Sequence, residues 1–224
     1  MKKLVLQIEH GGLGDNLLWS PIPRLAKQQY GYDAVYISTY SEFRNPETKR
    51  LVWGYNPYVD GYIEEKAAVP SFNCVEDGKN ILDTLVDFVG FPDDGVRFRD
   101  PELYYRPVYD GRFVDYVIYE PNYISEAGHP SVKAIQEYFN SRNIHITHQM
   151  EPMTNNLSIP GVPCLSMKGL ESFCNLIHSC KAFYCLTSGA ATLAAAIGKS
   201  VTVLHAGSNP MFHHSKDNTY VRLG

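Results

Sequence analysis

The residues between 183 and 205 constrain the fold more than any other part of this sequence. Two apolar, β-favouring runs, 183–186 and 201–205, flank an alanine-rich run over 190–196. Short apolar runs bounded by turn residues are typical of buried strands, and alanine is the strongest helix former. A helix between two strands of one sheet makes a parallel crossover. The segment therefore predicts a β-α-β unit within a parallel sheet.

The turn Thr187-Ser188-Gly189 begins the alanine helix. A hydroxyl at this position can cap free backbone N–H groups, and the glycine lets another group approach closely. A helix N-terminus whose donors point outward binds anions, most often phosphate. A well-capped core helix explains the same residues without any ligand, so two interpretations stand side by side here.

The rest of the chain alternates between strand-like and helix-like patterns. Apolar strand-like runs occur at 4–8, 34–38, 61–63, 115–120, 144–147 and 219–223. Helical spacing of apolar residues occurs at 16–26, 81–89, 132–139 and 170–177. A stretch rich in Pro, Asp and Tyr, 101–111, separates two such series. This pattern predicts an α/β protein with two Rossmann-like domains, residues 1–108 and 109–224.

Composition excludes several classes of protein. Of the 224 residues, 44% are hydrophobic and 20% charged, which is typical of a soluble globular chain. The net charge of −4, without a long basic run, argues against a nucleic-acid partner. The five cysteines include no Cys-x-x-Cys pair, which favours a reducing cytoplasm, with Cys174, Cys180 and Cys185 in the core. No segment approaches the length of a membrane span. Composition leaves the oligomeric state open.

A second glycine-rich turn, Gly11-Gly12-Leu13-Gly14-Asp15, follows the first apolar run. Its glycines permit positive φ angles and bring backbone N–H groups close to a ligand. The spacing fits neither a dinucleotide fingerprint nor a P-loop. Asp15 has two interpretations: it is a helix N-cap, or it is a carboxylate placed to accept a proton from an attacking hydroxyl.

Four segments of the sequence, taken together and in their order along the chain, resemble glycosyltransferase family 9, the heptosyltransferase-like group with the GT-B fold. The resemblance is carried by 11–18 with Pro21, by the turn Asn56-Pro57-Tyr58-Val59-Asp60, by Leu170-Glu171, and by 187–189 with the alanine helix. It spans most of the chain, which makes it more specific than any single motif.

The resemblance implies two Rossmann-like domains facing across a cleft, with the acceptor on the first and a nucleotide-diphosphate sugar on the second. Asp15 matches the general base of an inverting glycosyltransferase, and Gly11, Gly12 and Gly14 match the acceptor-side loop. The acceptor is expected to be a saccharide or a lipid-linked molecule, the latter compatible with peripheral membrane contact. No metal and no further cofactor is expected.

Eight residues match or adjoin the donor site of the family. They are Thr187, Ser188, Gly189, Ala190, Thr192, Glu171, His129 and Asn122. Glu171 matches an acid that binds the donor ribose, although a glutamate in the first turn of a helix is also favoured by the helix dipole.

The sequence also departs from the family. Thr187 and Thr192 replace an Asp and a His of the donor turn, and no Lys precedes a Trp-Pro pair, so His129 or His205 is the candidate cation. Typical members continue beyond the point where this chain stops, so the second domain is interpreted as truncated. These departures favour a second hypothesis, a non-catalytic module that binds a nucleotide sugar or a sugar phosphate. A nicotinamide-dependent reductase is a third, which the glycine spacing disfavours.

Overall fold

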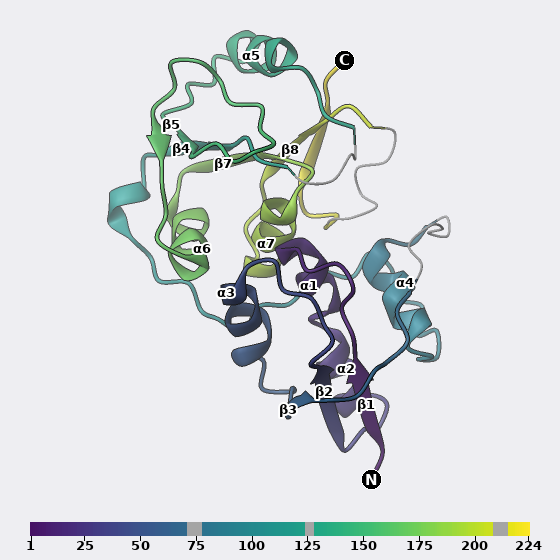
Figure 1. Ribbon diagram of the computed structural model, residues 1–224. Helices are drawn as coiled ribbons and strands as arrows, with labels where there is room; N and C mark the ends of the chain where they lie inside the picture. Colours follow the sequence, from purple (N-terminus) through teal and green to yellow (C-terminus); the bar gives the residue numbers. More distant parts are fainter. Residues whose placement is uncertain (71–77, 124–127, 208–214) are drawn as a thin grey trace. The chain divides into compact units, whose positions relative to one another are not determined.

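The computed structural model describes residues 1–70, 78–123, 128–207 and 215–224 of the chain. It divides into two compact units, Met1–Arg106 and Pro107–Gly224. Each unit contains one parallel sheet with helices packed on it, which confirms the predicted α/β class (Figure 1). The sequence had placed the division two residues later, between 108 and 109.

The first unit is built on a three-stranded parallel sheet in the order β1-β2-β3. The strands are β1 (Lys3–Leu6), β2 (Ala34–Ser38) and β3 (Gly61–Ile63). The helices are α1 (Leu13–Trp19), α2 (Ile22–Gln28), α3 (Pro46–Thr48), the π-helical turn η1 (Lys49–Gly54) and α4 (Ile81–Phe88). A proline is tolerated at the start of a helix because its missing N–H has no partner there, so Pro21 and Pro23 restart the chain as α2 after α1 ends.

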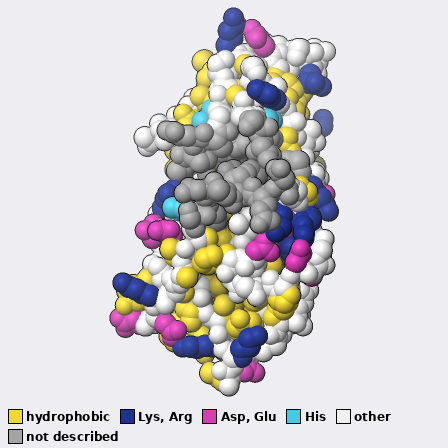
Figure 2. Space-filling model, turned by 90° about the vertical axis from the view of Figure 1, so that its right-hand side faces the viewer, with side chains coloured by type: hydrophobic (Ala, Val, Ile, Leu, Met, Phe, Trp, Pro, Cys, Tyr) yellow, Lys and Arg dark blue, Asp and Glu magenta, His cyan; other side chains and the backbone are white. Residues whose placement is uncertain are grey.

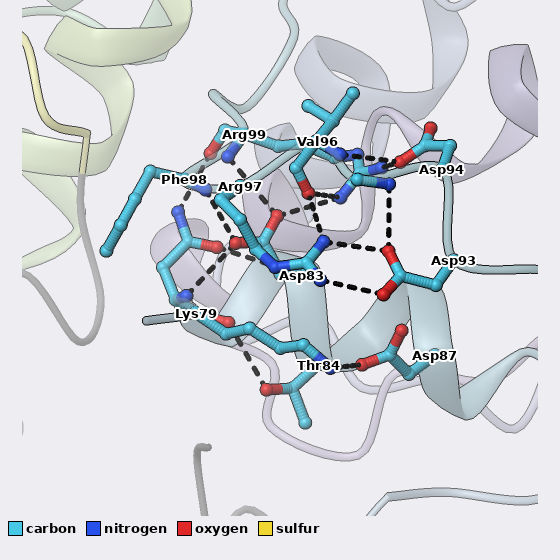
Figure 3. Close-up of polar contacts among 12 residues, drawn as sticks. Lys79, Asp83, Thr84, Asp87, Asp93, Asp94, Val96, Arg97, Phe98 and Arg99 are labelled. Atoms are coloured by element: carbon cyan, nitrogen blue, oxygen red, sulfur yellow. Dashed lines mark hydrogen bonds and ion pairs between the residues drawn. The ribbon is translucent and has the colours of Figure 1, made fainter. Parts of the chain in front are cut away.

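The first unit contains a buried polar cluster between α4 and the segment that follows it (Figure 3). The side chain of Asp83 is 2% exposed. Its carboxylate accepts hydrogen bonds from the backbone N–H groups of Asn80, at 3.1 Å, and Phe98, at 2.6 Å. It also forms an ion pair with Arg99 Nη1 at 2.9 Å, and Arg99 in turn pairs with Asp94. The cluster therefore fixes residues 94–99 against the start of α4.

The second unit contains a six-stranded parallel sheet. Its strands are β4 (Val117–Glu120), β5 (His148–Met150), β6 (Cys164–Leu165), β7 (Ala182–Leu186), β8 (Thr202–His205) and β9 (Thr219–Arg222). Its helices are the short 3-10 turn η2 (Gly111–Phe113), α5 (Val132–Ser141), α6 (Leu170–Ser179) and α7 (Gly189–Ile197). Helix α5 covers one face of the sheet, and α6 and α7 cover the other (Figure 1).

The strand predicted over 144–147 is wrong in position, because β5 begins at His148. Residues 143–146 instead close the C-terminus of α5. Asn143 adopts a left-handed conformation with φ 53°, and Ile144 N donates to Phe139 O at 2.9 Å. Ile146 then packs into the core between α5 and the sheet. The apolar residues that predict a strand therefore lie at the C-terminal end of α5 and in the core beside it.

The core of the second unit shows which way the strand residues point. On the α5 side, Tyr119, Leu186 and Leu204 pack with Ile135 and Phe139. Because successive strand residues point to opposite faces, their neighbours face α6 and α7. The predicted core cysteines are confirmed: Cys174, Cys180 and Cys185 are all buried. Cys164 is exposed, and Cys74 lies outside the described residues.

Candidate functional site

The strand order of the second unit marks one position at the carboxyl edge of its sheet. The order β6-β5-β4-β7-β8-β9 corresponds, in order along the chain, to 3-2-1-4-5-6. This is the doubly wound order in which the crossovers reverse direction between the first and fourth strands, here β4 and β7. Ligands of such sheets bind beyond the carboxyl ends of the strands at this reversal. The site therefore lies where Glu120 ends β4 and Leu186 ends β7.

The predicted donor turn lies at this reversal, directly after β7. Ser188 is the N-cap of α7, and its Oγ accepts a hydrogen bond from Ala190 N at 3.3 Å. Thr187 is 2% exposed, and its Oγ1 has no hydrogen-bond partner among the described residues. A buried hydroxyl without a partner is costly. Thr187 is therefore suited to bond a ligand oxygen at the start of the helix.

Small side chains allow α7 to lie close to the sheet. Ala190, Ala191, Thr192 and Ala194 are all buried. The helix ends at Gly198, whose left-handed φ of 78° disfavours any residue with a Cβ. The two interpretations of the turn are thus compatible, because a well-capped core helix presents its N-terminus at the binding edge of the sheet.

Two other predicted donor residues have contacts that explain them without a ligand. The Asn122 side chain donates to Glu151 O at 3.0 Å and accepts from Met153 N at 2.6 Å, which joins the segment after β4 to the segment after β5. Glu171 is half-buried in the first turn of α6, as the second residue of the helix. A carboxylate in this position is stabilised by the helix dipole. Their roles in donor binding stay predictions.

The segment after β4 meets the segment after β8. Ala206 N donates to Gly128 O at 2.9 Å, and a Cβ built on Gly128 would lie 2.7 Å from Gly207 N. Strand β7 lies between β4 and β8, so the two segments meet beyond the strand that leads to Thr187. This contact also positions His129, the predicted cation, whose ring lies 3.8 Å from the ring of Tyr123 between centroids.

Substituting Gly128 with Ala is expected to lower the melting temperature more than the matched substitution Gly161→Ala. Both glycines have positive φ, 76° and 83°, but a Cβ on Gly161 meets nothing within 4 Å. The backbone clash at Gly128 should add about 1–3 kcal/mol of destabilisation to the conformational strain that both variants share. Thermal or chemical denaturation measures the difference. Equal losses in the two variants would contradict the close contact.

Glu120 is a functional candidate that the sequence analysis did not identify. It is 6% exposed, and its Oε1 accepts a hydrogen bond from Asn122 N at 2.8 Å. No ion pair joins it to a cation of the described residues. Burial raises its pKa to about 7. The signal in the sequence was a single acidic residue ending an otherwise apolar strand.

His205 ends β8 and is 5% exposed. Its Nδ1–H donates to Gly207 O at 3.0 Å, which leaves the lone pair on Nε2. Burial lowers the pKa of His205. The hydrogen bond to Gly207 O opposes this shift, and the positive charge of Arg222 adds to it. The lowered pKa favours a neutral ring, which argues against His205 as the candidate cation.

In the first unit, Asp15 is the third residue of α1. The N-cap is Gly12, so the N-cap interpretation of Asp15 is wrong in position. The carboxylate reaches back to the cap instead, and its Oδ2 accepts from Gly12 N at 3.1 Å. Burial raises the pKa of Asp15, while the positive charges of His10 and Arg44 oppose that shift. A raised pKa makes the carboxylate a stronger base than an exposed aspartate.

The glycines beside Asp15 are explained by close packing. Gly12 has φ −69°, so the chain does not use the positive φ that a glycine permits there. A Cβ on Gly12 would lie 2.6 Å from Asp15 Oδ2, and one on Gly11 would lie 2.8–2.9 Å from the backbone of residues 42–44. Arg44 N also donates to Gly11 O at 2.9 Å. Gly14 is the second residue of α1 and is half-buried. The loops after β1 and β2 are therefore joined through backbone contacts.

The described residues give no sign of a metal centre or of a membrane span. Residues 1–70, 78–123, 128–207 and 215–224 contain no group of three His, Cys, Asp or Glu side chains that could hold a metal ion. No helix in the same ranges combines the length and the apolar character needed to cross a membrane.

The surface charges are mixed in sign. On the face drawn in Figure 2, Lys and Arg side chains are interspersed with Asp and Glu side chains.

Comparison with known proteins gives no match in sequence and several matches in structure. No family model matches the chain, and no curated protein matches it. A glycosyl transferase family 9 structure from Veillonella parvula DSM 2008 superimposes with a TM-score of 0.66 and 11% identity, over 99% of this chain and 85% of the other.

Two further structures come from E. coli. ADP-heptose lps heptosyltransferase II matches with a TM-score of 0.63 and 14% identity, over 99% of this chain and 90% of the other. The dodecameric iron-containing glycosyltransferase TibC of the enterotoxigenic strain H10407 matches with a TM-score of 0.66 and 15% identity. This chain spans 62% of the length of TibC. The fold is therefore the GT-B fold of glycosyltransferase family 9.

Proposed function

We propose that this chain, which has the fold of glycosyltransferase family 9, is a metal-independent inverting glycosyltransferase of the cytoplasm. It transfers a sugar from a nucleotide-diphosphate donor to a saccharide or lipid-linked acceptor. The second unit binds the donor, and the first unit provides Asp15 for the acceptor. The proposal rests on the buried hydroxyl of Thr187, which lies at the reversal point of a 3-2-1-4-5-6 sheet and has no partner within the described part of the chain.

The donor half of the proposal uses the start of α7. The partial positive charge of a helix N-terminus stabilises a diphosphate, and the hydroxyl of Thr187 donates to one of its oxygens. Structures with the same fold include one of TibC with ADP-D-beta-D-heptose and one of the E. coli heptosyltransferase WaaC with ADP. Those ligands support a nucleotide sugar as the class of donor.

The proposed reaction is a single displacement at the anomeric carbon. Asp15 accepts the proton of an acceptor hydroxyl as its oxygen forms a bond to the anomeric carbon. The bond between that carbon and the diphosphate oxygen breaks, and the nucleoside diphosphate leaves with the electron pair. Attack from the opposite side inverts the configuration. The helix N-terminus stabilises the charge that develops on the leaving diphosphate.

Thr187→Val tests the donor site, and Thr48→Val is its matched control. Both threonines are buried and have an Oγ1 without a partner among the described residues, but Thr48 lies on α3 of the first unit. We expect both variants to fold with unchanged or higher stability, because each loses an unpaired buried hydroxyl. Thr187→Val alone should weaken nucleotide-sugar binding about 10- to 100-fold, the range for a hydrogen bond to a charged group.

Calorimetry with ADP-, UDP-, GDP- and CDP-glucose measures binding, and product analysis with candidate saccharide acceptors measures transfer. Equal affinities in the wild type and Thr187→Val would remove Thr187 from the site. Binding without hydrolysis or transfer would favour the non-catalytic binding module. Failure of the wild type to bind any nucleotide sugar would reject both functions.

A further inference from the structure

We propose that Glu120 couples nucleotide-sugar binding to a proton: the site accepts the anionic diphosphate while the Glu120 carboxyl is protonated and loses affinity when it ionises. The inference rests on the proposed donor site of the second unit and adds a pH dependence to it.

The position of Glu120 on the sheet brings it to the donor turn. Glu120 is the last residue of β4 and pairs in register with Cys185, two residues before Thr187. Tyr119 packs toward α5, so Glu120 points to the opposite face, which α6 and α7 cover. Helix α7 begins on that face, directly after Thr187 and Ser188. The carboxyl and the proposed phosphate position thus share one corner of the sheet.

Among residues 1–70, 78–123, 128–207 and 215–224, no charged side chain compensates an ionised Glu120. Its carboxylate interacts electrostatically with Cys185 on β7 and with Tyr119, and burial raises the pKa of both groups, which keeps them neutral. On the same face, His205 of β8 has a lowered pKa, and Cys174 and Glu171 of α6 add no positive charge. The remaining contacts are with the backbone N–H and the side chain of Asn122. Both lower the pKa of Glu120, and the effect of burial outweighs them. The environment therefore favours the neutral acid, in agreement with its pKa of about 7.

The two protonation states of Glu120 have opposite effects on an anion. An ionised carboxylate beside a diphosphate repels it in a poorly solvated site. A protonated carboxyl removes this repulsion and adds a hydrogen-bond donor. A bound diphosphate consequently raises the pKa of Glu120 further. At a pH above the pKa that Glu120 has in the free protein, the protein therefore takes up a proton when it binds the ligand.

The experiment measures the dissociation constant of a nucleotide sugar as a function of pH. A nucleotide sugar is the suitable probe because its diphosphate is doubly substituted and keeps a constant charge near neutral pH. In the wild type, the dissociation constant of the best-binding nucleotide sugar should rise about 20-fold from about pH 6.5 to about pH 8.5, as one ionisation predicts. Calorimetry in buffers of different ionisation enthalpy should show uptake of nearly one proton per ligand at the higher pH.

Glu120→Gln keeps the oxygen that accepts from Asn122 N and removes the ionisation. Its affinity should be nearly constant over the same pH range and should exceed that of the wild type at the alkaline end. Glu151→Gln, an exposed acid at the end of the neighbouring strand β5, should follow the wild-type profile. The unchanged proton uptake of this control would exclude a general charge effect.

The outcomes separate this inference from the proposed function. Nucleotide-sugar binding that is independent of pH, without proton uptake, would overturn the role of Glu120 and leave the donor site in place. The same pH dependence in Glu120→Gln and in the wild type would assign the proton to another group. If the Gln variant fails to fold, the proton uptake of the wild type still decides the question. Absence of binding at every pH would instead reject the donor site itself.

Discussion

Asp15→Asn is expected to lower kcat for sugar transfer by a factor of about 10² to 10⁴, the usual contribution of a general base. The amide cannot accept the proton of the acceptor hydroxyl. It retains an oxygen that can accept from Gly12 N, the contact that the carboxylate makes at 3.1 Å. The fold should therefore survive the substitution. Steady-state kinetics with the donor identified by the binding screen gives the measurement.

A second variant at this position separates chemistry from folding. Asp15→Ala removes both the base and the cap contact, so it should match the kinetic loss of Asp15→Asn and in addition lose about 1 kcal/mol of stability. Wild-type turnover in Asp15→Asn would show that another group accepts the proton. Burial raises the pKa of Asp15, so the acidic limb of the rate profile should lie above the range of an exposed aspartate.

The largest expected loss of stability follows from Asp83→Ala, at about 3 kcal/mol of the free energy of unfolding. The substitution leaves the N–H groups of Asn80 and Phe98 without their acceptor and removes one of the two carboxylates that pair with Arg99 (Figure 3). Arg99 is itself largely buried, with 11% of its side chain exposed, so water replaces the lost partner poorly. Urea denaturation followed by circular dichroism measures the effect.

Asp87→Ala is the matched control, because Asp87 lies one turn further along the same helix. Its side chain is 38% exposed and pairs with Lys79 at 2.7 Å. Exposed ion pairs contribute about 0–1 kcal/mol, so this variant should remain close to the wild type. Similar losses in the two variants would mean that the buried cluster does not fix residues 94–99.

Local patterns in the sequence predicted most of the elements. The alternation of apolar runs and helical spacing located both sheets, because burial on a parallel sheet demands continuous apolar strands. The helix after Thr187 was evident from its alanines and from the cap at Ser188. The strand near 144 was misplaced because apolar residues that close a helix look like a short strand. Periodicity alone does not distinguish the two.

The features of the candidate site that were missed depend on contacts between distant segments. Gly128 packs against the backbone of Gly207, which lies in a loop far along the chain, and no local sequence pattern predicts such a contact. Glu120 is unusual only because it is buried, and its burial follows from the strand order β4-β7. The start of α1 was predicted three residues too late, at Asp15 instead of Gly12. A glycine can serve as an N-cap, and it has no side chain that marks the position in the sequence.

The contact between Asp15 and Gly12 has a consequence for how related sequences are interpreted. Because an oxygen of the Asp15 side chain caps α1, selection for folding alone favours an aspartate or an asparagine at this position. A descendant that has lost transfer would therefore keep one of these two residues after its donor turn had diverged. An oxygen acceptor at this position is evidence for a stable helix start, and an active lineage is better recognised by the residues after β7.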